Sequence, residues 1–249
     1  MNFDQILKDC KMRFKGFDKK VEVKRKPKSL EDAIIKKKDG GLKPVITEIK
    51  PASPSGVIKK VDDPKKIAEE MINGGACALS VLTEEKFFNG SLKNLKEVSS
   101  ISPIPVLRKD FIFDKNQVDQ SYYYGADSLL LIASFFKEDK LKVLIDKTRD
   151  FGMEPLVEIH SLEDYKTAKR AGARIYAINN RDKDTMQIDL KRSKIFPKHM
   201  EGTTVSASGI STLDDLNFVL GYCDAALVGT SVMTTDDIEG KVRGFVYGK

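Results

Sequence analysis

The residues with the clearest chemical potential lie in one stretch, PVITEIKPASPSG, at residues 44–56. A short apolar run leads into Glu48 and Lys50, and these two share a face because successive side chains of a strand alternate between faces. The loop that follows contains Ser53, Ser55 and Gly56, whose hydroxyls and unhindered backbone suit an anion. An exposed strand end with an ordinary surface ion pair would produce the same pattern. The rest of the chain must decide between the two interpretations.

A second ionisable residue, Lys109, stands at the end of another apolar run in the sequence LRKDF. Burial among apolar neighbours would lower the pKa of its ammonium group and make Lys109 a usable proton donor. The structural alternative is a rim lysine paired with Asp110. We therefore treat Lys109 as a candidate general acid.

A third, Glu158, lies within the apolar sequence LVEIH. Burial raises the pKa of a carboxyl group unless a cation such as Lys109 or Lys50 pairs with it, and either state suits acid or base chemistry. A structural buried ion pair is the alternative. His160 shares the face of Glu158 by parity, but as the last residue of its run it is interpreted as a loop or capping histidine.

Polar and glycine residues also follow the later apolar runs. Asn179 and Arg181 share a face, and Arg181 could hold a carboxylate by a bidentate pair. The segments 208–211 (SGIS) and 228–231 (VGTS) contain glycines that let backbone N–H groups approach an anion. A short helix that begins near Thr230 would direct its positive end the same way, which predicts a phosphate site; ordinary strand-to-helix turns are the alternative.

Eight apolar, often β-branched runs must position these groups. They occupy residues 44–50, 77–83, 105–111, 128–134, 154–160, 175–181, 203–209 and 225–231. Segments of helical period separate most of them, at 64–73, 92–99, 115–124, 137–151, 162–171 and 213–220, whereas the link around 190–195 is irregular. This alternation predicts a (β/α)8 TIM barrel. A doubly wound open sheet would gather its ligand groups at one switch point, but here polar residues follow every strand.

Before the barrel, residues 1–43 are predicted to form an N-terminal helical extension. The first helix carries Ile6 and Leu7, and the second begins after Ser29 and ends at the glycine pair 40–41. The extension is expected to pack on the catalytic barrel of residues 44–249, which makes one domain overall.

Composition narrows the function classes. The chain has 249 residues, of which 41% are hydrophobic and 32% charged, and its net charge is +6. Residues 1–43 hold 14 Lys and Arg against 7 Asp and Glu, a balance of +7 that leaves −1 for the rest. The basic clusters lack interleaved aromatic residues, so a nucleic-acid ligand is not expected. No apolar run reaches the roughly 18 residues of a membrane span, which predicts a cytoplasmic protein.

Cysteine and histidine patterns give no reason to expect a metal or a catalytic thiol. The three cysteines, Cys10, Cys77 and Cys223, are far apart and form no CxxC pair. They are interpreted as reduced, mostly buried thiols. Neither of the two histidines lies in a cysteine-protease-type signature.

Several segments, in this order along the chain, resemble indole-3-glycerol phosphate synthase. They are EIKPASPSG (48–56), SVLTEEKFFNGSLKNL (80–95), PVLRKDFIFD (105–114), GADSLLLIA (125–133), GMEPLVEIH (152–160), INNRD (178–182), SASGIS (206–211) and LVGTSVM (227–233). The resemblance implies a cofactor-free carbon-carbon lyase, a carboxy-lyase of tryptophan biosynthesis. Such an enzyme converts 1-(2-carboxyphenylamino)-1-deoxyribulose 5-phosphate to indole-3-glycerol phosphate, carbon dioxide and water.

The resemblance also implies roles for individual residues. Lys109 would protonate the alkoxide formed at ring closure, and Glu158 with Glu48 and Lys50 would serve the later acid and base steps. Asn179 would orient substrate hydroxyls, and Arg181 and Ser208 would contact the anthranilate part. The phosphate side would comprise Lys50, Ser53, Gly209, Gly229 and Thr230. No metal is implied, and the partner would be a phosphorylated small molecule bound by a monomer or a weak homo-oligomer.

One position departs from the family pattern. Where the family commonly has a glutamate in the seventh barrel strand, this chain has Ala207, followed by Ser208 and Gly209. Glu48 and Glu158 remain, so the chemistry is still expected. Two alternatives stay open: another phosphate-binding barrel enzyme such as a sugar-phosphate isomerase, for which an Asp or Cys would be expected at the end of the first strand, and a non-catalytic barrel.

Overall fold

The computed structural model of the chain describes residues 3–54 and 56–248, and its centre is a closed barrel of eight parallel strands. The barrel strands are β1 (Val45–Ile49), β4 (Ala78–Leu82), β5 (Val106–Lys109), β6 (Ser128–Ile132), β7 (Glu154–Ile159), β8 (Ile175–Asn179), β9 (Thr203–Ala207) and β10 (Ala225–Val228). They follow one another around the barrel in chain order, and β10 closes against β1. The predicted (β/α)8 fold is therefore confirmed.

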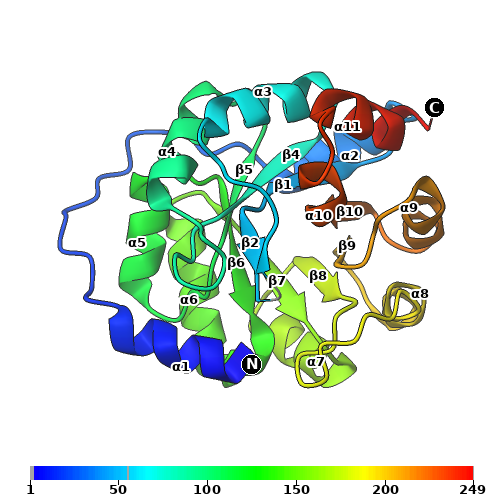
Figure 1. Cartoon of the computed structure of the whole chain (residues 1–249). Coiled ribbons are helices and arrows are strands. Elements are labelled where there is room, and N and C mark those ends of the chain that lie inside the picture. The colour runs from blue at the N-terminus through cyan, green and yellow to red at the C-terminus, as the bar shows by residue number, and fades with distance from the viewer. Residues whose placement is uncertain (1–2, 55, 249) are drawn as a thin grey trace.

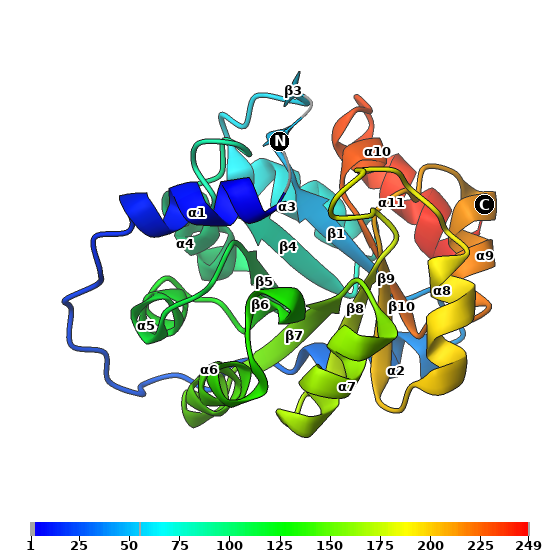
Figure 2. The same cartoon turned by 90° about the horizontal axis from the view of Figure 1, so that it is seen from below.

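Helices surround the barrel on its outside (Figures 1 and 2). The longer ones are α3 (Pro64–Asn73), α4 (Leu92–Ile101), α5 (Lys115–Tyr123), α6 (Glu138–Asp150), α7 (Leu162–Arg170), α9 (Leu213–Leu220) and α11 (Ile238–Tyr247). The irregular link before β9 contains the short α8 (Arg192–Ile195) and η2 (Phe196–His199). Two further short helices lie at strand ends: η1 (Ala133–Phe135) directly follows β6, and α10 (Thr230–Met233) begins one residue after β10.

Most of the helices begin where a side chain caps the first turn. A Ser, Thr or Asp accepts a hydrogen bond from a backbone N–H of that turn, which satisfies a donor that the helix itself cannot pair. The capping residues are Ser29, Asp63, Ser91, Asp114, Ser161, Thr212 and Asp237. In five of the six outer helices that the sequence predicts closely, the capping residue stands directly before an apolar periodic segment; the sixth, α6, begins after Lys137 without a side-chain cap. The helix α11 was not predicted, because its sequence contains the weak helix formers Gly240 and Gly244, although its buried residues Ile238, Val242, Phe245 and Val246 recur with helical period.

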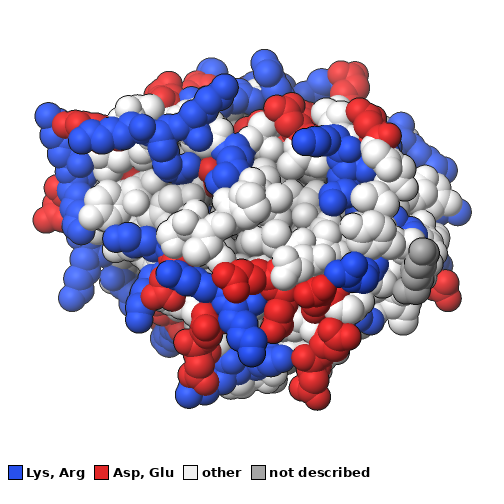
Figure 3. All heavy atoms as spheres, turned by 90° about the horizontal axis from the view of Figure 1, so that it is seen from above, with Lys and Arg blue, Asp and Glu red and all other residues white. Residues whose placement is uncertain are grey.

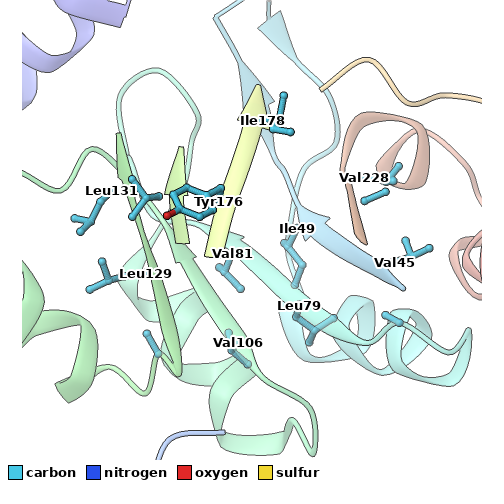
Figure 4. Close-up of a cluster of buried hydrophobic side chains, with 14 of the residues drawn as sticks. Val45, Ile49, Leu79, Val81, Val106, Leu129, Leu131, Tyr176, Ile178 and Val228 are labelled. Carbon is cyan, nitrogen blue, oxygen red and sulfur yellow. The ribbon is translucent and has the colours of Figure 1, made fainter. Parts of the chain in front are cut away.

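Both faces of the barrel strands are buried, so the strands are apolar almost throughout. Outward side chains such as Leu131 and Tyr176 pack against the helices in one large cluster, part of which is shown in Figure 4. Inward side chains such as Ile46, Leu107 and Leu156 form a second cluster inside the barrel. Toward the carboxyl ends of the strands this inner layer changes from apolar to charged residues such as Glu48, Lys109 and Glu158, and this end of such barrels is where active sites lie.

The two helices of the N-terminal extension lie at different ends of the barrel. In Figures 1 and 2 the helix α1 (Phe3–Arg13) and the helix α2 (Leu30–Asp39) are on opposite sides of the molecule, joined by an extended segment that passes outside α5. Leu30 and Ile34 of α2 and Ile6 and Cys10 of α1 belong to the inner cluster. Each helix therefore covers apolar side chains at one end of the barrel.

One short element was not expected from the sequence. The Pro/Ser/Gly segment after β1 forms a two-stranded hairpin of β2 (Ala52–Ser53) and β3 (Gly56–Val57). The backbone N–H of Ala52 donates to the carbonyl of Phe88 at 3.1 Å, so the hairpin is joined to the loop after β4. Ser55 lies outside the described residues.

Surface charge is mixed on the face shown in Figure 3. There the Lys and Arg side chains are interspersed with Asp and Glu, and an uncharged area occupies the centre of the face. Among the helices of residues 3–54 and 56–248, none combines the length and hydropathy that a membrane crossing requires.

Candidate active site

A cavity of about 290 Å³ opens at the carboxyl ends of the barrel strands. Cations and carboxylates form part of its lining, and aromatic and aliphatic side chains form the rest. The lining residues are Lys50, Ser53, Pro54, Leu82, Glu84, Phe88, Lys109, Asp110, Phe111, Leu130, Ile132, Glu158, Asn179, Arg181, Met186 and Ser208. Seven of the eleven residues predicted from the sequence thus meet at one cavity: Lys50, Ser53, Lys109, Glu158, Asn179, Arg181 and Ser208.

Glu48 lies just beneath this cavity, with only 1% of its surface exposed. Its Oε2 is 2.8 Å from Lys109 Nζ, its Oε1 is 3.8 Å from Lys50 Nζ, and Ser80 Oγ donates to Oε2 at 3.3 Å. Burial alone would raise the pKa of Glu48, but the charges of Lys109 and Lys50 outweigh it and hold the pKa below its usual value. Glu48 is therefore an ionised carboxylate shared by two ammonium groups, not an exposed strand-end pair.

The two lysines of this cluster are shifted in opposite directions. Burial lowers the pKa of Lys109, but the carboxylates of Glu48 and Glu158 outweigh burial and leave it raised. Burial also lowers the pKa of Lys50, and the like charges of Lys109 and Arg181 add to that effect, so it stays below its usual value. Opposite shifts in neighbouring titratable groups are typical of a site that needs both an acid and a base.

The prediction that Lys109 has a lowered pKa is thus wrong, because the carboxylates of Glu48 and Glu158 face the ammonium group and outweigh burial. The alternative partner, Asp110, binds other groups. It accepts from Arg108 Nη2 at 2.8 Å and from Thr83 Oγ1 at 2.5 Å. Lys109 is therefore free of that pairing and directed to Glu48.

On the other side of Lys109, Glu158 is held by two donors from neighbouring positions. His160 Nε2 and Asn179 Nδ2 lie 2.9 Å and 3.0 Å from the same oxygen, Oε1. Burial would raise the pKa of Glu158, but the hydrogen bond and charge of His160, with Lys109 and Asn179, keep it low. His160 lies in the loop directly after β7, as interpreted from the sequence, but its side chain is buried and paired with Glu158. The face parity noted in the sequence is what brings it there.

Arg181 and Ser208 complete the polar part of the lining. Arg181 Nη1 donates to the carbonyl of Met186 at 3.0 Å, and its backbone N–H donates to Asn179 Oδ1 at 3.0 Å. Ser208 has a φ of 73°, a conformation that is uncommon for a residue with a Cβ. Such backbone strain often marks a functional site.

The predicted glycine side of the site is close to this cluster but is not part of the cavity lining. A Cβ at Gly229 would lie 2.7 Å from Glu48 Oε1, so only glycine lets the start of α10 approach the carboxylate. Gly209 has a φ of 84°, and a Cβ there would lie 2.4 Å from Ile188. Thr230 is exposed at the first position of α10, which confirms the predicted short helix.

The apolar lining residues and Glu84 are not among the site residues predicted from the sequence. Glu84 is buried, and its Oε2 accepts from the backbone N–H groups of Phe87 and Phe88 at 2.6 Å and 3.2 Å, while Arg13 of α1 lies 2.6 Å from Oε1. Glu84 therefore fixes the loop that carries Phe88 into the cavity. The position of Glu84, two residues after the end of β4, could have indicated a role at the barrel mouth. The alternation of side chains in β6 could likewise have indicated that Leu130 and Ile132 point into the barrel.

The described part of the chain holds no group of three or more His, Cys, Asp or Glu side chains arranged to bind a metal ion. The three cysteines are buried and unoxidised. Burial raises the pKa of each thiol to about 12, so none is a reactive thiolate near neutral pH.

Comparisons with known proteins identify the family of this chain. A profile of the family described as indole-3-glycerol phosphate synthase matches residues 4–245. The chain is 46% identical over 249 residues to indole-3-glycerol phosphate synthase of Methanocaldococcus jannaschii, covering 97% of this chain and 91% of that protein. It is 38% identical to the same enzyme of Acetivibrio thermocellus, covering 97% and 94%.

A solved structure supports the fold alone. The chain resembles 3-hexulose-6-phosphate synthase from Salmonella typhimurium with a TM-score of 0.65 and 14% sequence identity, covering 81% of this chain and 96% of that one. The profile match over nearly the whole length and the identity to full-length relatives decide the family. This chain belongs to the indole-3-glycerol phosphate synthase family, the carboxy-lyases of tryptophan biosynthesis.

Proposed function

We propose that the activity of this indole-3-glycerol phosphate synthase resides in the cavity at the barrel mouth, with Lys109 as its central acid. The observation that carries the proposal is the position of the Lys109 ammonium, 2.8 Å from one buried carboxylate, Glu48, and within the field of a second, Glu158. An ammonium group held between two carboxylates stays protonated until the reaction draws a proton from it. The surrounding apolar lining strengthens these charges because it excludes water.

Ring closure is the first step. The ring carbon that bears the substrate carboxylate attacks the keto carbon of the deoxyribulose chain, and a carbon-carbon bond forms as the carbonyl electrons move to oxygen. Lys109 donates its proton to that oxygen, and a positive charge develops on the anilino nitrogen. The ionised Glu158 offsets this charge, which favours the transition state over the ground state.

Decarboxylation and dehydration follow. The carbon–carboxylate bond breaks, carbon dioxide leaves, and its electron pair neutralises the nitrogen cation. The hydroxyl formed at ring closure then leaves as water after it receives a proton, and loss of a ring proton completes the indole. Lys50, with its lowered pKa, and Glu48, its carboxylate neighbour, supply the proton donor and acceptor for this stage.

Substrate binding is divided between the cavity and the glycine turns beside it. We assign the phosphate to Lys50, Ser53 and the backbone at Gly209, Gly229 and Thr230, because glycine at 209 and 229 allows close backbone approach. Arg181 and Ser208 contact the anthranilate carboxylate, and Asn179 orients the hydroxyls. Leu130, Ile132 and Phe111 give the aromatic ring an apolar surface.

Ala207 does not remove this machinery. It is buried on the inner face of β9 next to Asn179 in register, and the two carboxylates named above hold their lysine and histidine partners without it. A non-catalytic barrel is therefore not favoured.

The test is the formation of the fluorescent indole product from 1-(2-carboxyphenylamino)-1-deoxyribulose 5-phosphate. Lys109→Met should lower kcat about 10²–10⁴-fold, since it removes a positioned proton donor. Lys142→Met on the exposed side of α6 is the matched control and should leave turnover unchanged. Turnover that persists in Lys109→Met would contradict the assignment of Lys109.

A further inference from the structure

His160 is buried beside Glu158 and is not among the residues that line the cavity. Only 4% of the His160 side chain and 3% of the Glu158 side chain are exposed. The donors from His160 and Asn179 both reach Oε1 of Glu158, at 2.9 Å and 3.0 Å. These two bonds therefore occupy one oxygen of the carboxylate and leave Oε2 for the cavity that Glu158 lines.

The backbone of His160 is held from two further elements. Its N–H donates to Asp164 Oδ2 of α7 at 2.8 Å, and Arg192 Nη1 of α8 donates to its carbonyl at 3.3 Å. These contacts fix the position of the imidazole ring, so its distance from Glu158 is set by the fold. An imidazole ring that is fixed in this way can hydrogen-bond to Oε1 of Glu158 without also reaching Oε2.

The charges that face this pair come from several elements. Glu158 and Asp164 favour the protonated imidazole, and the backbone of Arg181 also contributes. Lys109 faces Glu158 from β5, and Arg192 approaches the His160 carbonyl from α8. Burial opposes protonation of His160, but the two carboxylates and the Arg181 backbone outweigh it and raise the pKa of His160.

We propose that His160 is a positioning residue for the proposed reaction: its imidazolium holds Oε1 of Glu158 and keeps that carboxylate ionised, so that Oε2 faces the substrate. The inference rests on the catalytic role of Glu158 given above. His160 is not itself one of the residues that line the cavity, so we assign its effect to the carboxylate of Glu158 that it contacts. Two different donors on one oxygen restrict rotation of the carboxylate. An unpaired glutamate at the same place would rotate more freely.

The sign of the pH dependence follows from the pair. The charge of His160 helps to hold the pKa of Glu158 below its usual value, so Glu158 stays ionised down to acidic pH. Without that charge, burial would raise the pKa of Glu158, and the carboxylate would become protonated at a higher pH. The acidic limb of the kcat/KM profile must then move to higher pH.

The experiment compares His160→Gln with His199→Gln. Glutamine keeps a neutral N–H donor but no charge, and His199 is the other histidine of the chain, exposed in η2. His160→Gln should move the acidic limb of kcat/KM upward by about one pH unit, as loss of a nearby opposite charge does. His199→Gln should leave the limb where it is in the unaltered protein.

An acidic limb that does not move in His160→Gln, even with a uniformly lower kcat, would overturn the proposal, because a structural role lowers activity at every pH.

A second measurement needs no turnover. In the NMR titration of the intact protein, His199→Gln identifies the His160 signal, which should titrate above about 6.5, the ordinary value for histidine. A midpoint at or below that value would overturn the pairing. Failure of the proposed function would instead appear as absence of indole product from the unaltered protein.

Discussion

Both ends of the barrel bury carboxylates, but the groups that bind them differ. At the mouth, Glu48 and Glu158 are bound by lysine and histidine side chains. At the opposite end, Asp127 precedes β6, and one of its oxygens accepts from the backbone N–H of Val106 at 3.0 Å. Its partners also include the Arg25 guanidinium at 2.7 Å and both the backbone and the ammonium of Lys28.

Glu154, the first residue of β7, extends the contrast. Its carboxylate accepts from Ser29 Oγ at 2.7 Å and from the backbone N–H groups of Leu30 and Glu31 at 2.6 Å and 3.0 Å. Negative charge at the first turn of α2 is favoured by the helix dipole. Apart from the Lys28 ammonium, which lies 3.4 Å from Asp127, the donors at this end are backbone N–H groups, a guanidinium group and a hydroxyl, which do not release protons near neutral pH. These carboxylates therefore attach the N-terminal extension to the barrel, whereas those at the mouth have partners that can exchange protons.

The largest effect that the contrast predicts is on activity at the mouth. Glu48→Gln keeps the side-chain shape but removes the charge that holds Lys109 and Lys50, so kcat should fall about 10²–10³-fold. Indole fluorescence gives kcat, and circular dichroism checks that the variant is folded. The opposite outcome, nearly unchanged kcat, would place Glu48 with the structural carboxylates.

The next effect is on stability at the opposite end. Asp127→Ala leaves Arg25 and the buried N–H of Val106 without their partner, and the free energy of unfolding should fall by about 3 kcal/mol. Urea unfolding measures it, with Asp146→Ala as the control, since that exposed i,i+4 partner of Lys142 contributes little. The folded Asp127→Ala protein should retain its kcat; a loss of kcat at a temperature where it is fully folded would show that the two ends are not separate in function.

Much of this arrangement is readable from the sequence because strands obey a period of two. Alternation alone predicts that Glu48 and Lys50 share a face of their strand and that Glu158 and His160 share a face of theirs. The cavity is lined by residues that follow successive apolar runs. The number of strands and the fold class follow from the same alternation of strand and helix segments.

What the sequence could not supply is the set of partners across the barrel. The pKa of Lys109 is raised because the carboxylates of Glu48 and Glu158 face its ammonium group. These two residues come from strands that are far apart in the chain, and burial alone predicts the wrong sign of the shift. The role of His160 depends on Glu158 being turned toward it, and that of Glu84 depends on Arg13 of a distant helix. The hairpin β2–β3 depends on Phe88 for one of its hydrogen bonds.

The smallest effect concerns the balance of charge at the mouth. Two of the lining carboxylates, Glu84 and Asp110, are paired with arginines outside the cavity lining, Arg13 and Arg108. In the remaining cluster three cations, Lys50, Lys109 and Arg181, face two carboxylates, Glu48 and Glu158, which leaves one cation in excess before His160 is counted. A substrate with a carboxylate and a phosphate benefits from this excess. Ala207 is buried beside Asn179, so Ala207→Glu would add a third carboxylate close to these cations.

Ala207→Glu should therefore raise KM for the carboxyphenylamino-deoxyribulose phosphate about tenfold, equivalent to about 1.4 kcal/mol of binding, with a smaller change in kcat. Ala207→Gln has nearly the same volume and no charge, so it separates crowding from electrostatics. If both variants raise KM equally, crowding is the cause. If Ala207→Glu instead raises kcat, the mouth lacks an acid or base group, and the buried carboxylates of this chain are fewer than its chemistry needs.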